Sequence, residues 1–370
     1  MKKNITLLLV FCLIQTTNAQ LMQGHRIDDQ NRVTFTVEAP NAKEVKVINL
    51  SDSLAMGAPE YKLQKKENGK WTVTTRPCRV GFHYYQLEID GFKCGDPASQ
   101  HYFGWGKWIS GLEIPPKDID YYQPKANIER GEVRYHHFMS EVTGTYRKCI
   151  VYTPPGYDQG NKGYPVLYLQ HGAGESELGW TMQGKANIIL DNLIAERKAT
   201  PMIIVMNNGY AARVGAENPA RPRRDDNVFK EFLLSDVIPM IEKDYRTLKG
   251  KENRAIAGLS MGAGQAMRIG LENPELFGSI GSFSGGSRNF DLNTSYDGAF
   301  KNAKAFNKGN DLLWIGCGQL DFLWENALRL HNELEKGGIE HTWDVSTGSH
   351  EWQVWRHHLH EFAQVVFKQS

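Results

Sequence analysis

The stretch "RAIAGLSMGAGQA", residues 254–266, decides the fold of this chain. A short apolar run typical of a β-strand passes without a break into a run of small residues typical of a helix. Ser260 stands at the join, between Gly258 and Gly262. A turn this tight leaves room for little more than glycine beside the serine. The stretch therefore predicts a strand, a sharp turn that presents a serine, and a helix.

Gly258, Ser260 and Gly262 fit the pattern G-x-S-x-G, which holds a serine hydroxyl above the carboxyl end of a strand. The helix that follows offers unpaired N–H groups and the positive end of its dipole to a developing oxyanion. The pattern by itself is weak in a chain with 36 glycines, and a purely structural turn is the alternative. Because the flanking strand and helix are indicated independently, we predict that Ser260 is a nucleophile.

Strands and helices alternate around this turn, and this order predicts a mostly parallel sheet with helices on both faces. In such sheets the functional residues collect on loops at the carboxyl ends of the strands. The predicted strands are "RKCIVYTPPGY", "YPVLYLQHG", "PMIIVMNNG", "RAIAG", "DLLWIGCG" and "HTWDVS". The predicted helices are "ANIILDNLIAERK", "NVFKEFLLSDVIPMIEKDY", the helix after Ser260, "LWENALRLHNELEKGG" and a closing helix from about Trp352.

A serine nucleophile needs a base, and the base needs an acid that orients it. In this type of sheet the chain order is Ser, then Asp or Glu, then His, each after a later strand. Asp321 follows the strand "DLLWIGCG" directly and is the predicted acid. Glu325, one turn into the next helix, and Asp344, inside a strand, are alternatives that fit the loop requirement less well.

The predicted base is His350, in the loop "TGSHEW" after the last strand. Alternatives are the three histidines of "RHHLHE", among which His357 and His360 share one helix face beside Glu361. Such a spacing could hold a metal ion, but a packed or solvated helix face is the commoner explanation. We therefore expect neither a metal ion nor an organic cofactor.

The oxyanion also needs a second donor, from a loop earlier in the sheet. The run His171-Gly172-Ala173-Gly174 follows an apolar strand and is similar to the HG-type loop of esterases. We predict an oxyanion hole made by the N–H of Met261 and that of Gly172 or Ala173.

Four aromatic residues lie in or beside the predicted carboxyl-end loops and are candidates for substrate binding, although any one of them could be core. They are Trp180, Tyr210, Trp352 and Trp355.

The first third of the chain has another rhythm, with short alternating runs such as "RVTFTVEAP", "EVKVINL", "KWTVTT" and "HYYQLEID" separated by turn residues. This pattern predicts an immunoglobulin-like β-sandwich over residues 20–116, followed by a linker at 117–131 and an α/β domain at 132–370. The sandwich either binds glycan or packs on the α/β domain, and we favour packing. Its glycan-binding candidates are Trp71, Tyr84, Tyr85 and Trp105.

Residues 1–19 have two lysines, an apolar run from Ile5 to Ile14 and a polar end at Ala19. This is the pattern of a secretory signal peptide cleaved after Ala19, and it predicts a secreted or periplasmic protein. Cys78 and Cys94 are close enough in sequence to pair, and free thiols are the alternative. The formal net charge of +1 disfavours nucleic acid or an anionic membrane as the main partner, and no later segment could span a bilayer.

Five motifs follow one another between about Arg134 and the end of the sequence: "VYTPPGYD", "YPVLYLQHGAGESELGW", "DNLIAERKATPMIIVMNNG", "GLSMGAGQA" and "GSHEWQVWRHHLHEF". In these motifs the chain resembles the feruloyl and acetylxylan esterases of carbohydrate esterase family one, the esterase D-like α/β-hydrolases. The first domain resembles the immunoglobulin-like modules found beside glycogen-branching and related carbohydrate enzymes.

The resemblance implies an α/β-hydrolase fold, the triad Ser260–His350–Asp321 and hydrolysis of feruloyl esters on plant xylan or arabinoxylan side chains. An acetylxylan esterase on the same scaffold is the first alternative. A carbohydrate-binding protein with an inactive hydrolase domain is the second, and the intact triad argues against it. A peptidase on this fold has less weight, because the first domain resembles modules of carbohydrate enzymes.

Overall fold

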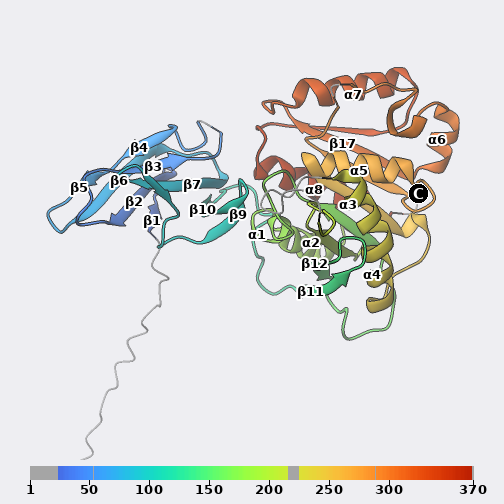
Figure 1. The fold of residues 1–370 in the computed structure, drawn as a ribbon, viewed down its shortest axis with the longest axis horizontal. Helices are drawn as coiled ribbons and strands as arrows, with labels where there is room; N and C mark the ends of the chain where they lie inside the picture. Colours follow the sequence, from blue (N-terminus) through green and yellow to red (C-terminus); the bar gives the residue numbers. More distant parts are fainter. Residues whose placement is uncertain (1–23, 53, 216–224, 288, 369–370) are drawn as a thin grey trace, which may run out of the picture.

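The computed structural model describes residues 24–52, 54–215, 225–287 and 289–368 (Figure 1). The signal peptide predicted at residues 1–19 lies outside these ranges. Within them, no helix is both long enough and apolar enough to cross a membrane.

The N-terminal module, residues 24–114, consists of antiparallel β-strands in two sheets, blue to cyan in Figure 1. Along β2 the buried and exposed side chains alternate, with Val33, Phe35 and Val37 facing the core between the sheets. One sheet has the order β1(His25–Ile27), β2(Arg32–Glu38), β6(Lys70–Pro77), β5(Gln64–Lys65). The other has the order β4(Glu60–Lys62), β3(Val45–Asn49), β7(Gly81–Ile89), β10(Lys107–Ile114), β9(His101–Gly104), and β8(Phe92–Cys94) also pairs with β7.

All four cysteines in the described ranges are free thiols. Cys78 is buried beside Thr75, and Cys94 is half-buried in β8. The disulfide considered for this pair is therefore absent from the structure, and the alternative of free thiols holds.

The second part of the chain forms one eight-stranded sheet with strands β13 to β18 parallel, which confirms the predicted mostly parallel sheet. The order is β11(Glu132–Ser140), β12(Thr145–Thr153), β14(Ile203–Asn207), β13(Val166–Gln170), β15(Arg254–Leu259), β16(Ser279–Phe283), β17(Leu312–Gly318), β18(Thr342–Ser346). β11 and β12 enter as an antiparallel pair at one edge. Two of these strands, β11 and β16, were not predicted from the sequence.

Helices cover both faces of this sheet. They are α1(Gly179–Met182), α2(Ala186–Ala195), α3(Asp226–Phe232), α4(Ile238–Asp244), α5(Met261–Glu272), α6(Ala303–Gly309), α7(Trp324–Lys336) and α8(Trp352–Val365), with short 3₁₀ segments η2(Lys251–Asn253) and η3(Ser295–Gly298). A π-helical turn, η1(Leu233–Val237), joins α3 to α4, so the single helix predicted there is present but widened just before Pro239. Proline clashes with the carbonyl four residues earlier in an α-helix, and the wider turn relieves this clash.

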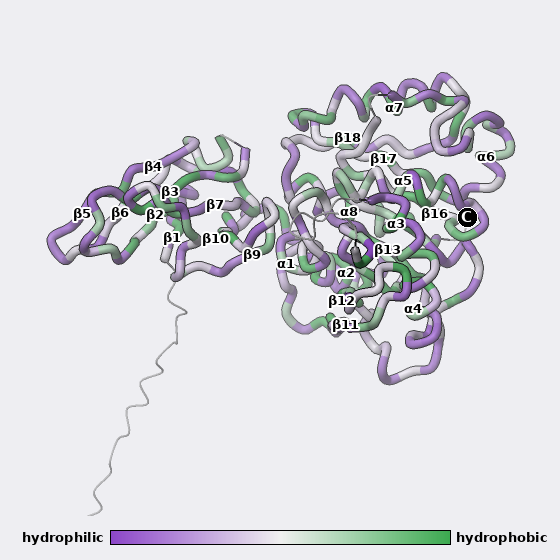
Figure 2. The backbone as a smooth tube through the Cα atoms, in the orientation of Figure 1, coloured by the Kyte–Doolittle hydropathy of each residue, from purple (hydrophilic) through white to green (hydrophobic). Residues whose placement is uncertain are grey.

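The period-two alternation of the central strands divides the core into two layers. In β13, Leu167 and Leu169 belong to the cluster covered by α2 and α8, whereas Val166 and Tyr168 belong to the cluster covered by α3, α4, α5 and α7. In Figure 2 the apolar colour is concentrated in the middle of the α/β domain, and the outlying loops are mostly polar.

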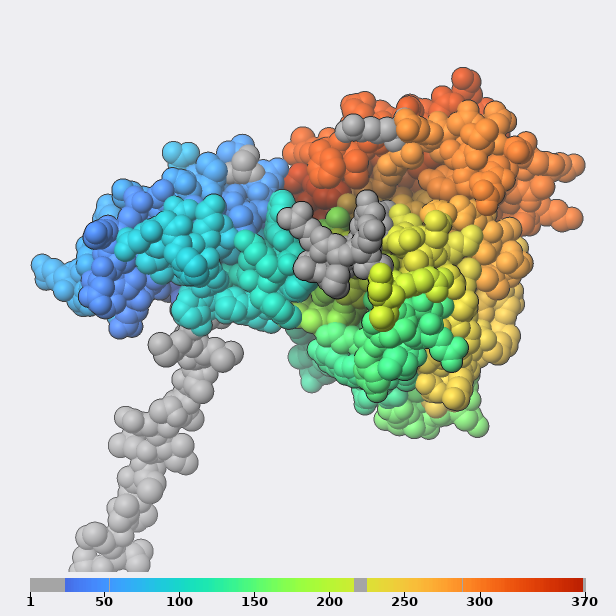
Figure 3. All heavy atoms as spheres, viewed as in Figure 1, coloured from blue at the N-terminus to red at the C-terminus, as the bar shows by residue number. Residues whose placement is uncertain are grey.

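The N-terminal module packs against the α/β domain (Figure 3), and the interface between the two parts is called the seam below. Phe82, Tyr84 and Ile109 of the module share one buried apolar cluster with the residues around α2 and α8. Beside this cluster the fully buried Arg356 of α8 forms two hydrogen bonds with the Glu113 carboxylate of β10, at 2.7 and 2.9 Å. The module is thus joined to the domain by both apolar and charged contacts.

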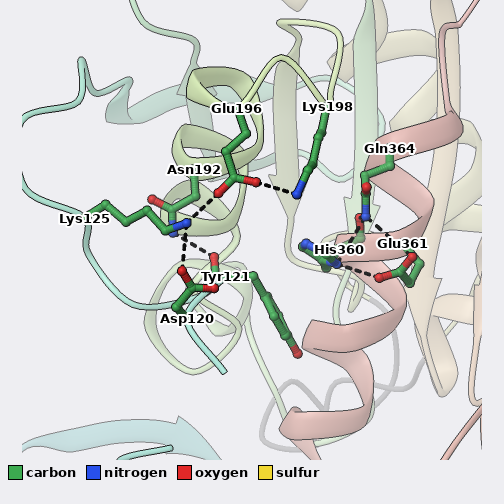
Figure 4. Close-up of polar contacts among 9 residues, drawn as sticks. All are labelled: Asp120, Tyr121, Lys125, Asn192, Glu196, Lys198, His360, Glu361 and Gln364. Carbon is green, nitrogen blue, oxygen red and sulfur yellow. Dashed lines mark hydrogen bonds and ion pairs between the residues drawn. The ribbon is translucent and has the colours of Figure 1, made fainter. Parts of the chain in front are cut away.

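The segment predicted as a linker, residues 117–131, has no helix or strand but is held against α2 and α8 (Figure 4). Asn192 donates hydrogen bonds to the carbonyls of Tyr121 and Gln123, at 2.8 and 2.9 Å. The Tyr121 ring lies 4.3 Å from the His360 ring, and Lys125 bridges Asp120 and Glu196. These contacts hold the connection between the two parts in place.

We predict that Glu113→Gln lowers the free energy of unfolding by about 3 kcal/mol, because it leaves the buried Arg356 guanidinium without its counter-charge. Chemical denaturation followed by tryptophan fluorescence measures the change. Glu44→Gln, which removes an exposed carboxylate on the module, is the control and should leave stability nearly unchanged. Equal stability of both variants would show that this ion pair does not hold the seam together.

Candidate active site

Ser260 lies at the turn between β15 and α5 with φ 52° and ψ −112°, a backbone conformation that non-glycine residues rarely adopt. Its N–H donates to the carbonyl of Phe283 at the end of the neighbouring strand β16, at 2.9 Å. Its carbonyl accepts the N–H of Gly264 in the first turn of α5, at 3.2 Å. Strained residues held in this way cluster at functional sites.

The two glycines beside Ser260 are required by close backbone contacts. A Cβ on Gly258 would lie 2.5 Å from the carbonyl group of Gly262, and one on Gly262 would lie 2.6 Å from the carbonyl oxygen of His171. Both distances are shorter than van der Waals contact allows. The turn therefore brings α5 directly onto the end of β13, and this contact sets the height of the serine above the sheet.

The predicted base and acid lie together. His350 Nδ1 is 2.8 Å from Asp321 Oδ2, and the Asp321 side chain is buried. The other carboxylate oxygen, Oδ1, accepts the N–H of Leu323 at 2.8 Å, which orients the carboxylate. Of the alternative acids, Glu325 is exposed on α7 and Asp344 binds two other histidines.

Ser260 and His350 line the same cavity, which has a volume of about 520 Å³. This is within the range of small-molecule sites. The imidazole packs edge-on against Trp355, with ring centroids 5.0 Å apart, and against Phe322 at 4.4 Å. These rings leave little freedom for the imidazole to leave its carboxylate partner.

The predicted oxyanion donors lie next to Ser260. Gly172 and Ala173 line the cavity beside Ser260, and in the described part of the chain neither of their N–H groups has an acceptor. Met261 is the first residue of α5, where an N–H has no partner within its own helix. The N–H groups of Gly172 and Ala173 are therefore unpaired at the cavity wall, and that of Met261 is unpaired within α5 beside Ser260.

The loop that carries these donors is fixed from behind. His171 is buried, its Nδ1 lies 2.8 Å from the carbonyl oxygen of Gly172, and its Nε2 accepts the N–H of Gly209 at 2.9 Å. Burial lowers the pKa of His171 to about 4, so the ring is neutral at pH 7. The neutral ring holds the Gly172 and Gly209 backbones in place through these contacts. The Tyr210 hydroxyl accepts the N–H of Gly174 at 2.7 Å.

The four aromatic candidates for substrate binding separate into two pairs. Trp352 and Trp355 line the cavity. Trp180 and Tyr210 do not line it. Trp180 is buried in the core and donates from Nε1 to the carbonyl of Gln170, and Tyr210 supports the donor loop. A position in a loop at the carboxyl end of a strand therefore does not by itself distinguish a ring that lines the cavity from one that packs behind it.

Many of the residues that line the cavity were not predicted from the sequence. The N-terminal module contributes Leu50, Ser51, Asp52, Phe82, Tyr84 and Trp105, and the loop after β17 contributes Leu320 and Phe322. The aromatic richness of the module was a signal for Tyr84 and Trp105, but nothing in the sequence indicated that they face Ser260. By contrast, Trp71 and Tyr85 are buried in the core of the module.

A buried acid, Glu175, also lines the cavity at the seam between the two parts. It accepts hydrogen bonds from the Tyr84 hydroxyl at 3.0 Å and from the Gln183 amide at 3.2 Å. Burial raises the pKa of Glu175 to about 8, and the hydrogen bond from Tyr84 only partly opposes the shift. The side chain is therefore mostly neutral at pH 7.

The histidines of α8 are held by hydrogen bonds. Asp344 Oδ2 lies 2.7 Å from His358 Nδ1 and 3.3 Å from His357 Nε2, and these three side chains are close enough together to share a metal ion. His360, which the sequence paired with His357, instead contacts Glu361 and stacks near Tyr121. The carboxylate already satisfies both rings, so the group is explained by packing of α8 on β18.

The sheet order, the strained serine after β15 and the helices on both faces define an α/β-hydrolase. Residues 140–364 match the protein family described as putative esterase. The chain therefore belongs to this esterase family, and its class is that of the carboxylic ester hydrolases.

Individual relatives agree with this assignment. The chain is 39% identical, over 92% of its length, to an endo-1,4-β-xylanase/feruloyl esterase from Xylanibacter ruminicola, of which it spans 46%. It is 29% identical to a ferulic acid esterase from Anaeromyces mucronatus solved with ferulic acid, with a TM-score of 0.57 over 68% of this chain and 96% of that one. The enterobactin esterase of Shigella flexneri shares the fold over 92% of this chain and 96% of its own, with a TM-score of 0.63 at 16% identity.

We predict that Asp321→Asn lowers kcat by about ten-thousandfold with little change in KM, because the amide stabilises the wrong tautomer of His350. Initial rates on a chromogenic ester measure the loss. Glu325→Gln is the matched control on the same segment and should retain full activity. Comparable losses in the two variants would contradict the assignment of Asp321 as the acid.

We predict that Glu175→Gln changes how stability depends on pH. The pKa of Glu175 is raised from about 4.5 to about 8 in the folded protein. The contribution of Glu175 to the free energy of unfolding is therefore complete below pH 4.5 and is lost as pH rises toward 8. Between these values the wild type should lose up to ~1.4 kcal/mol per pH unit relative to the variant. The opposite effect of His171, which acts between about pH 4 and 6.5, is common to both proteins and cancels in the difference.

Denaturation midpoints at pH 5, 6, 7 and 8 test this expectation. Parallel curves for the two proteins would mean that Glu175 is ionised throughout, and that burial does not control its charge.

Proposed function

We propose that this protein is a serine esterase that releases hydroxycinnamic acids, ferulic acid in particular, from their esters with xylan side chains. The observation that carries the proposal is the contact between His350 and Asp321 in a cavity that also contains Ser260 and is walled by aromatic rings. The names of the Xylanibacter and Anaeromyces relatives support the same acyl group.

In the proposed first half-reaction, Ser260 Oγ attacks the ester carbonyl while His350 Nε2 takes the hydroxyl proton. Asp321 holds the imidazole so that Nδ1 carries its proton toward the carboxylate, and it stabilises the imidazolium that forms. The N–H groups of Met261 and of Gly172 or Ala173 stabilise the oxyanion. His350 then protonates the sugar hydroxyl as it leaves, and an acyl-enzyme remains.

In the second half-reaction, His350 takes a proton from water, and the resulting hydroxide attacks the acyl carbon. The same N–H groups stabilise the second oxyanion, and its collapse releases the acid and returns the proton to Ser260. The chain's own residues supply every proton transfer in this scheme, so it includes no metal ion and no organic cofactor.

The size and lining of the cavity favour an aromatic acyl group over acetate. Phe82, Trp352 and Trp355 provide flat aromatic walls, Leu259 adds an aliphatic one, and a volume of about 520 Å³ is far more than an acetyl group fills. Tyr84 and Glu175 add polar atoms at the seam, where the hydroxyl and methoxy groups of a phenolic ring could hydrogen-bond. Acetylxylan esterase activity is the second candidate only because relatives with other acyl specificities share the scaffold.

We also propose that the chain is exported, because residues 1–19 have the pattern of a signal peptide. Feruloylated xylan is a cell-wall polymer too large to enter a cell, so its esterase is needed outside the cytoplasm. We propose as well that the exported chain consists of a module at residues 20–116, a linker at 117–131 and an esterase domain at 132–370.

We predict that the wild type releases ferulate from methyl ferulate much faster than acetate from acetylated xylan, and that Ser260→Ala lowers ferulate release by at least about a thousandfold. Chromatography of the released acids measures both. Ser282→Ala, a buried serine on the adjacent strand whose hydroxyl has no partner among the described residues, is the control and should remain active. Release of acetate alone would favour the acetylxylan candidate, and an active Ser260→Ala would remove the mechanism.

A further inference from the structure

Trp105 is an unusual residue at the tip of the β9–β10 hairpin of the N-terminal module. With Gly106 it forms a two-residue turn in which both backbones are left-handed, at φ 55° and 73°. This is the geometry of a type I′ turn, which favours Asn or Asp before Gly. The β7–β8 hairpin of the same module follows the rule, with Asp90 and Gly91 at φ 49° and 85°. Tryptophan at this position therefore carries a conformational cost that the fold does not require.

The Trp105 side chain is also poorly placed for a structural role. It is 67% exposed, and within the described ranges it has no paired aromatic ring and no hydrogen bond from Nε1. A large apolar ring that is both strained and exposed contributes little to stability. Strain of this kind is usually maintained because the residue has a function.

The hairpin is nevertheless fixed against the active site. Gly106 donates its N–H to the carbonyl of Gly174 at 2.8 Å, and a Cβ on Gly174 would lie 3.1 to 3.3 Å from the backbone of Trp105 and Gly106. Gly174 follows the predicted oxyanion donors Gly172 and Ala173. The backbone of Trp105 is thus packed against the loop that carries the predicted donors, although it comes from the other part of the chain.

Trp105 lines the catalytic cavity at its exposed rim. The other strongly exposed apolar residues of the lining, Leu320 and Phe322, come from the loop after β17. The remaining aromatic residues of the lining, such as Phe82 and Trp352, are buried. The cavity therefore has an enclosed apolar interior and an open rim formed by both parts of the chain.

We propose that Trp105 is a carbohydrate-stacking residue that binds the sugar on the alcohol side of the ester. This inference rests on the proposed function and extends it to the leaving group. The acyl group is small and apolar and fits the interior, whereas the polysaccharide is too large to enter and has to lie across the rim. The C–H groups on one face of a pyranose or furanose ring form an apolar surface, and this surface can pack on the apolar face of an exposed indole. The module thereby contributes to substrate selection as well as to packing.

The test compares two substrates that share the acyl group and differ in the alcohol, methyl ferulate and a feruloylated arabinoxylan oligosaccharide. Trp105→Asn removes the ring and restores the favoured Asn-Gly turn, so the variant should fold with an unchanged or higher melting temperature. We expect KM for the oligosaccharide to rise about tenfold, the loss of one well-packed aromatic contact, with kcat unchanged. Both constants for methyl ferulate should stay at the wild-type values.

Two further variants complete the design. Trp105→Phe keeps a ring and should recover most of the affinity for the oligosaccharide. Trp108→Ala removes another exposed tryptophan, in β10, that does not line the cavity, and it should leave both substrates unaffected. An unchanged KM for the oligosaccharide in Trp105→Asn would overturn the proposal. An equal loss on methyl ferulate would overturn it as well, because the ring would then serve the acyl group.

A binding measurement separates this proposal from the proposed function. Calorimetric titration of Ser260→Ala with unesterified arabinoxylan oligosaccharides should show binding that Trp105→Asn weakens in the same background. If the wild type fails to hydrolyse methyl ferulate but this Trp105-dependent binding persists, the esterase proposal is wrong and the sugar site stands. If hydrolysis is normal and binding does not depend on Trp105, the sugar site is wrong and the esterase proposal stands.

Discussion

The close approach of α5 to the end of β13 is the constraint on which the active site depends. Gly262 lies against the carbonyls of Gln170 and His171, and Gly258 lies against Gly262, so that no side chain separates the helix from the sheet. Ser260, between them, has to adopt a left-handed backbone conformation, at a cost of about 1–3 kcal/mol. The surrounding parallel strands supply the rigidity that keeps this conformation in place.

Several features of the site follow from this one contact. The serine lies at the carboxyl edge of the sheet, where the loops after β13, β17 and β18 also begin. Consequently the Gly172–Ala173 loop and His350 reach the same cavity from two different strands, and Asp321, after a third strand, contacts His350 from behind. A looser packing of α5 would move the serine and the helix terminus together.

The seam between the two parts of the chain is the second organising feature. Tyr84 of the module, with Glu175 and Gln183 of the α/β domain, forms a buried polar cluster enclosed by apolar side chains. Hydrogen bonds between buried polar groups are strong in such surroundings, so this cluster helps to orient the two parts. The module is therefore a structural wall of the catalytic cavity and brings its own side chains to the site.

Local sequence pattern was sufficient for most of the α/β domain. The strands with dense runs of Val, Ile and Leu, such as β13 and β14, and the strand–turn–helix at Ser260 could be predicted because their signals lie within a few residues. β16 was missed because "SIGSF" has few apolar residues, and β11 because it is a mostly exposed edge strand. Both gain their structure from pairing with neighbours that are distant in sequence.

For the site, the sequence by itself determined the residue types and their order along the chain: a serine between glycines, then Asp321, then His350. These can be read locally because each follows a strand directly. Only the tertiary structure decided which rings face the cavity, since Trp180 and Trp352 have equally suitable positions in the sequence and opposite positions in space. It also decided that Leu50, Phe82 and Trp105 of the N-terminal module line the same cavity as Ser260. The reason is physical: a seam between two folded parts depends on the shapes of both surfaces, and no periodicity or spacing within either segment records it.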